Sequence, residues 1–117
     1  MLAVNLKHLH SPDLDVGSLP PDPANCKVLV QATIGPTNVD GGDTFDFVVV
    51  TPAAVAALGA CWGRGTLILP MFSWEEIERF LRRLIATSPG NDWPSVASAL
   101  GRELLWEFDG YRSGQAI

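Results

Sequence analysis

The sequence CKVLVQATIGPTNVDGGDTFDFVVV, residues 26–50, decides the fold of this chain. Apolar and polar side chains alternate through 26–34 and again through 44–50, and this alternation predicts two half-buried β-strands. The connection between them contains Asp-Gly-Gly-Asp at 40–43, where glycine tolerates the positive φ of a tight turn. A connection this short favours an antiparallel pair. The residues that we expect on its core face are Val28, Val30, Ile34, Phe45, Phe47 and Val49.

The clearest helix signal is FSWEEIERFLRRLIA at 72–86. Ser73 and Glu76 have the spacing of a capping box, in which side chains at the helix start satisfy unpaired backbone N–H groups. The apolar residues that follow recur every three or four positions, so they form one stripe that can pack against a sheet. Glu75 precedes Arg79, and Glu78 precedes Arg82, by one helical turn, which favours ion pairs along the helix. A second, shorter helix is predicted over 91–101.

The remaining predicted elements lie on both sides of these two segments. Alternation predicts a strand over 2–9, and the proline-rich segment 10–25 is expected to be a long surface loop. Threonine followed by proline at 51–52 is typical of a helix start, where the threonine side chain caps the helix. Short apolar segments predict a buried strand over 66–70 and a last strand over 104–108.

The elements and the composition together indicate one α+β domain spanning residues 1–117. We expect a mainly antiparallel sheet of four to five strands with two to three helices packed against it. Apolar residues make up 47% of the chain and charged residues 18%, as in globular domains. Cys26 and Cys61 lack the spacing of a metal or redox motif, so we expect reduced, buried thiols. Because the N-terminus lacks a signal-peptide core and no apolar segment reaches the ~20 residues of a membrane span, we expect a cytoplasmic protein.

The charge of the chain narrows the classes of partner. Thirteen acidic residues against eight Lys and Arg give a net charge of −5, which argues against binding nucleic acid or an anionic membrane. Residues 1–63 hold six acidic residues, all of them Asp, against two lysines. Most of these aspartates lie in predicted loops, so we expect a localised negative surface that suits a basic protein partner.

Two patterns could in principle hold a metal ion. His8 and His10 lie on one side of a regular strand, and Asp13 and Asp15 follow them. A proline interrupts this stretch and the chain has no third histidine, so a strand end followed by a turn is favoured. The 40–43 turn lacks the further ligands of a calcium loop. We therefore predict no catalytic residue, no cofactor and no metal.

The aromatic residues leave two interpretations open. Trp62, Phe72 and Trp74 could form the rim of the core, or one tryptophan could anchor a partner, as exposed Trp does at many interfaces. The segment WEFDGYR at 106–112 mixes aromatic rings with charges of both signs, which is typical of an interface. Its Trp and Phe could equally fill the core from a short strand.

Taken together, these motifs resemble the immunity protein 8 family, which is found beside toxin genes in bacterial polymorphic toxin systems. The resemblance covers nearly the whole chain, because the motifs occur in family-like order and at family-like spacing. One departure follows position 52, where the family tends to carry a large aromatic residue and leucine and this chain has Ala-Ala-Val at 53–55. This departure affects the prediction of a partner contact by the first helix, and it does not affect the prediction of the fold. The matching residues are 9–13, 34–36, Gly42, 45–47, 51–52, Gly65, Leu67, Ile68, Trp93, Leu100, 106–108, Tyr111 and Arg112.

The resemblance implies a non-catalytic protein that binds and neutralises a cognate toxin in the producing cell. A nuclease toxin would carry a basic cleft, which acidic loops would complement. Two alternatives stay open, namely a small metal-dependent enzyme using His8, His10 and Asp13, and a structural interaction domain without a toxin. A free sheet edge would also allow a homodimer. From charge and loop position, the residues that we predict to contact the partner are Asp13, Asp15, Asp40, Asp43, Glu107, Asp109, Tyr111 and Arg112.

Overall fold

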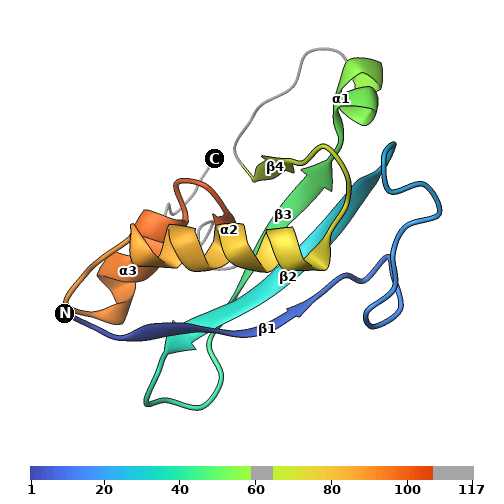
Figure 1. The fold of residues 1–117 in the computed structure, drawn as a ribbon. Coiled ribbons are helices and arrows are strands. Elements are labelled where there is room, and N and C mark those ends of the chain that lie inside the picture. The colour runs from blue at the N-terminus through green and yellow to red at the C-terminus, as the bar shows by residue number, and fades with distance from the viewer. Residues whose placement is uncertain (59–64, 107–117) are drawn as a thin grey trace, which may run out of the picture.

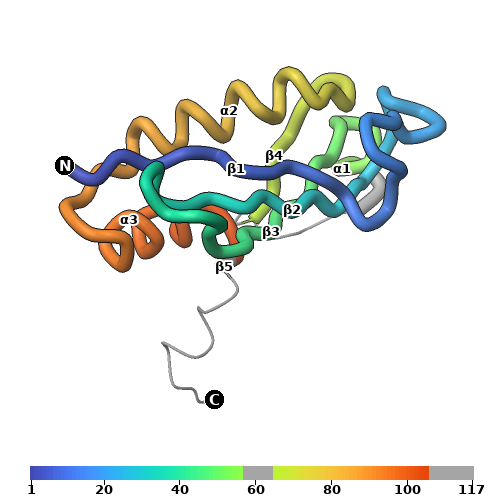
Figure 2. Tube along the Cα trace, turned by 90° about the horizontal axis from the view of Figure 1, so that it is seen from below, coloured from blue at the N-terminus to red at the C-terminus, as the bar shows by residue number. Residues whose placement is uncertain are grey.

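A computed structural model describes residues 1–58 and 65–106 of the chain, and Figure 1 shows the arrangement of its elements. The architecture is α+β, with a mixed sheet whose strands are mostly antiparallel, as predicted. Helix α2 crosses one face of this sheet (Figure 2). The elements in chain order are β1 (Val4–His10), β2 (Lys27–Pro36), β3 (Asp43–Val50), α1 (Pro52–Leu58), β4 (Thr66–Ile68), α2 (Trp74–Ala86), α3 (Trp93–Leu100) and β5 (Leu105–Trp106).

The hairpin predicted over 26–50 forms the centre of the sheet. Strands β2 and β3 pair antiparallel, with Val30 opposite Phe47 and Ala32 opposite Phe45. The strand order is β1-β2-β3-β4, and the short β5 also pairs with β3. Strand β4 is parallel to β3, whereas β1, β2 and β5 pair antiparallel with their neighbours. The predicted core-face residues are confirmed, because Val28, Val30, Ile34, Phe45, Phe47 and Val49 are each at most 4% exposed.

Strand β1 departs from the regular alternation that the sequence predicts. Its pairing with β2 shifts between Leu6 and His8, so one extra residue is accommodated in β1. Because such a bulge exchanges the two faces of a strand, Leu6 and Leu9 both pack against the core. His8 and His10 consequently lie on the opposite face, whereas unbroken alternation would have placed them beside Leu6. The two rings remain close, with centroids 5.1 Å apart.

The core lies between the sheet and helices α2 and α3. Ile77 and Leu81 of α2 and Leu100 of α3 are buried against the strands. The ring of Phe45 meets Trp93 edge to face, with centroids 6.2 Å apart and an interplanar angle of 86°. Burial of these apolar side chains stabilises the fold by about 1.5–3 kcal/mol each.

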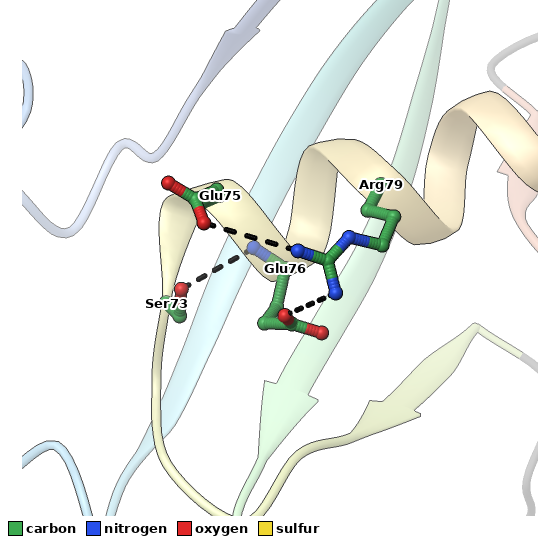
Figure 3. A network of polar contacts seen from close by, with 4 residues as sticks. All are labelled: Ser73, Glu75, Glu76 and Arg79. Carbon is green, nitrogen blue, oxygen red and sulfur yellow. Dashed lines mark hydrogen bonds and ion pairs between the residues drawn. The ribbon is translucent and has the colours of Figure 1, made fainter.

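The start of α2 shows how the sequence fixes a helix end (Figure 3). The Ser73 hydroxyl accepts a hydrogen bond from the Glu76 backbone N–H at 3.2 Å, which is one half of the predicted capping box. The Glu76 carboxylate lies 2.7 Å from the Arg79 guanidinium, and the Glu75 carboxylate lies 3.8 Å from it. Arg79 thus shares two glutamates of the first turn, and the ion pair expected between positions 75 and 79 is present.

Two other predicted elements differ in detail. The segment predicted as a buried strand over 66–70 forms only a three-residue edge strand, and Ile68 in it is 57% exposed. Helix α1 begins at Pro52 as predicted, but the Thr51 hydroxyl accepts from the Cys26 N–H at 3.1 Å and so connects two segments of the chain instead of capping the helix. Cys26 is a free thiol but is only half-buried, whereas a buried thiol was predicted, and Cys61 lies outside the described residues.

Candidate functional site

The loop after β1 is fastened to β2 by Ser11 and Asp13. The buried Ser11 hydroxyl donates to the Leu29 carbonyl at 2.5 Å and accepts from the Asp13 N–H at 3.0 Å. The Asp13 carboxylate accepts from the Leu29 N–H at 3.1 Å. Asp13, which we predicted as a partner contact, therefore provides an acceptor for a backbone N–H of β2 that lies beyond the last residue pair of β1 and β2. Asp13 is also exposed, and its contact with a partner stays a prediction.

The next turn of the same loop displays its side chains to solvent. Asp15 is exposed, and the neighbouring Val16 is 99% exposed. The Asp15 carbonyl accepts from the Ser18 N–H at 2.9 Å, which closes a turn, and Gly17 within it has a φ of +74°. A fully exposed valine beside a carboxylate gives this turn a surface of mixed apolar and acidic character.

Two other predicted aspartates lie at the β2–β3 turn, Asp40 in the connection and Asp43 as the first residue of β3. Asp40 is exposed in this turn, whereas the Asp43 carboxylate accepts from the Trp93 indole N–H at 2.8 Å and so joins the hairpin to α3. The first loop is fastened to Leu29, near the start of β2, and the second loop follows Pro36, at the end of β2. Seven steps along the strand separate these two residues by about 23 Å. The structure therefore places the two acidic loops at opposite ends of the sheet (Figure 1).

The C-terminal part of the predicted partner face cannot be placed in the fold. Glu107, Asp109, Tyr111 and Arg112 lie outside the described residues, and so does Trp62. Those four contact residues therefore remain predictions from the sequence.

A groove of about 520 Å³ lies at the end of the sheet that carries Asp15. Its walls come from the end of β1, from the first turn of the following loop, and from the first turns of α2. The loop therefore meets a helix that follows it by more than fifty residues. Sequence reasoning assigned Glu75 and Glu78 only to ion pairs along α2, and the structure adds both to the wall of this groove.

Trp74 lines the groove and connects the loop to the start of α2. Its indole N–H donates to the Ser18 carbonyl at 2.8 Å, and its ring meets Phe72 edge to face with centroids 5.2 Å apart. Phe72 is buried, and its backbone N–H donates to the Pro23 carbonyl at 2.8 Å. Trp74 packs against the core, as the first interpretation of this residue expects. It also lines an open groove, where the second interpretation expects a partner to bind.

Two buried polar atoms lie near this end of the sheet without a hydrogen-bond partner among the described residues: Nδ1 of His10 and Oδ1 of Asp46. They belong to one row across the sheet, because His10 pairs with Gln31 and Gln31 pairs with Asp46. An unpaired buried polar atom costs about 1–3 kcal/mol, so a hydrogen-bond partner at either atom would be favourable.

A second cleft, of about 310 Å³, lies on the other flank of α2, towards β4. It is mainly apolar, with Leu81 and Leu104 in its wall, and it carries one charge of each sign, at Arg83 and Glu103. The Arg83 guanidinium lies 5.3 Å from the centre of the Phe80 ring. This cleft lacks the excess of negative charge that distinguishes the groove beside Asp15.

Metal binding was the alternative chemistry for this end of the chain. Within residues 1–58 and 65–106, no group of three or more His, Cys, Asp or Glu is arranged to hold a metal ion. In that same part of the chain, no helix is both long enough and apolar enough to cross a membrane.

Comparison with known proteins identifies the chain at the level of its family. The model of the family described as immunity protein 8 matches residues 4–111. The chain belongs to the immunity protein 8 family. The match spans β1 to β5 and confirms the resemblance found in the motifs. No curated protein and no solved structure matches this immunity protein 8 family member.

Proposed function

We propose that this immunity protein 8 family member binds a cognate toxin in the cytoplasm of the producing cell and neutralises it without catalysis. The family match over residues 4–111 is the observation that carries the proposal. An immunity protein acts by occupying or blocking its toxin, so its function requires a complementary surface and no reacting group.

The charge of the chain supports a toxin with a basic surface, such as a nuclease. The net charge is −5, and the acidic residues of the first half are all aspartates. Opposite charges across an interface accelerate association and select the partner. Among the eight residues predicted to contact the toxin, Asp15 and Asp40 are the exposed aspartates whose positions best suit direct contact, because Asp13 and Asp43 bind the protein's own backbone and indole.

Co-expression tests the proposal directly. The product of the gene adjacent to the one encoding this chain is induced in bacteria with and without the immunity protein, and growth is followed. We expect the neighbour alone to stop growth and the pair to grow normally, with the two proteins purifying as one complex. A harmless neighbour, or a neighbour that still kills in the presence of this protein, would contradict the proposal and favour a structural interaction domain.

A further inference from the structure

We propose that the groove beside Asp15 receives a lysine or arginine side chain of the toxin. This inference rests on the proposed function and specifies where and how the toxin binds. The methylene groups of this side chain would lie along the apolar lining of the groove. Its charged end would lie among the carboxylates of Asp15, Glu75 and Glu78.

The charge of the groove favours a cation. Three carboxylates line it, from Asp15, Glu75 and Glu78, and none of its lining residues is Lys or Arg. The two glutamates reach Arg79 and Arg82 at 3.8 and 3.2 Å on the surface of α2. Exposed ion pairs of this kind are weak, so an incoming cation can share or replace them.

The apolar part of the groove fits the stem of such a side chain. Trp74, Leu14 and Val16 line the groove, where Leu14 is half-buried against the core and Val16 is 99% exposed. Lys and Arg bury their methylene groups on apolar surfaces while the charge stays with polar groups, and both bind to the face of tryptophan. An aspartate or glutamate of the partner would meet like charge here, and a purely apolar side chain would bring no positive charge to the carboxylates.

The groove is largely formed before a partner arrives. The Ser11 hydroxyl donates to the Leu29 carbonyl and the Asp13 carboxylate accepts from the Leu29 N–H, which fixes the loop to β2. The Trp74 indole N–H donates to the Ser18 carbonyl and fixes the loop to α2. Little conformational entropy is then lost on binding, which favours a tight contact at a small site. The second cleft, beside Arg83 and Glu103, offers no comparable match to a basic partner.

The test compares two double variants that each remove two negative charges with little change in shape. Asp15→Asn with Glu78→Gln neutralises the groove, and Asp22→Asn with Glu103→Gln neutralises two exposed acids outside it. Association with the purified adjacent-gene toxin is measured by surface plasmon resonance at low and physiological ionic strength. Circular dichroism melting curves establish that both variants are folded.

We expect the groove variant to bind at least tenfold more weakly and to lose much of the salt dependence of association, while the control stays within twofold of the wild type. Each Lys and Arg of the toxin is then replaced in turn, and binding to the wild type and to the groove variant is compared in a double-mutant cycle. One of these replacements should weaken binding to the wild type but not to the groove variant. Equal losses in both variants, or none in either, would overturn this inference alone. A wild-type protein that does not bind the toxin would overturn the proposed function as well.

Discussion

Asp13 and Asp15 lie two residues apart in one loop, yet their carboxylates have different surroundings. The Asp13 carboxylate accepts the Leu29 N–H at 3.1 Å, whereas Asp15 is exposed on the wall of the groove. We therefore expect Asp13→Ala to reduce the stability of the free protein and Asp15→Ala to leave it unchanged. For affinity to the toxin we expect the opposite order, so that Asp15→Ala weakens binding more than Asp13→Ala.

The magnitude follows from the bond that is lost. A hydrogen bond to a charged acceptor contributes about 1.5–3 kcal/mol, and partial replacement by water at this exposed loop reduces the expected loss to about 1 kcal/mol. For a chain of this size, that loss lowers the midpoint of thermal unfolding by about 4–5 °C. Asp13→Asn keeps an oxygen acceptor and should lose less than half as much.

Thermal unfolding followed by far-ultraviolet circular dichroism, together with urea titration, measures these differences. Asp15→Ala should stay within about 0.5 kcal/mol of the wild type, as most exposed substitutions do. If Asp15→Ala destabilised the protein as much as Asp13→Ala, or if Asp13→Ala melted like the wild type, the division between an anchoring and a contacting aspartate would be wrong.

Three further predictions concern the hairpin, α3 and the thiol. A Cβ on Gly42 would lie 2.6 Å from the Ile34 carbonyl carbon, so Gly42→Ala must separate two strands and should cost about 3 kcal/mol in urea unfolding. Hydrogen bonds at the start of α3 lower the pKa of Asp92 below its usual 3.8. The stabilisation by that carboxylate is therefore complete above pH 3.8 and lost as the pH falls through the lowered pKa, so melting curves of Asp92→Ala and wild type should converge in acid. Burial and the nearby Asp22 carboxylate raise the pKa of the Cys26 thiol, so in a Cys61→Ser background Asp22→Asn should speed alkylation at pH 8.

Each of these has a result that would count against it. Gly41→Ala is the control for the hairpin, because its φ of +73° is strained for alanine but no atom lies within 4 Å, and it should cost only about 1 kcal/mol. An equal loss of unfolding free energy in both variants would show that the steric contact at Gly42 is not what destabilises the hairpin. A melting difference at Asp92 that is constant with pH would remove its carboxylate as the cause. Unchanged or slower alkylation after Asp22→Asn would mean that this carboxylate does not control the thiol.

Local patterns in the sequence were sufficient wherever a single periodicity decided the outcome. The alternation in 26–50 predicted the hairpin and its core face, and the capping box at Ser73 predicted where α2 begins. Each of these signals is contained within a few residues of the structure that it specifies, because strand alternation and helix capping are local constraints.

Predictions failed where the result depended on segments far apart in the chain. The bulge in β1 places Leu9 in the core and reverses His8 and His10, and it reflects how β1 fits against β2. The groove could not be predicted either, because it joins a loop near Asp15 to the start of α2 near Glu75. The capping box showed where the helix begins but held no information on which loop packs beside it.

The separation of the acidic loops changes how the net charge of −5 can act. The two loops lie about 23 Å apart along β2, and charges in physiological salt are screened over about 8 Å. A toxin approaching one end of the sheet is therefore attracted mainly by that end. The groove end collects Asp15, Glu75 and Glu78, whereas the hairpin end presents Asp40 after Asp43 has bonded to Trp93. Charge removal at the two ends should accordingly have additive effects on binding, with the larger effect at the groove.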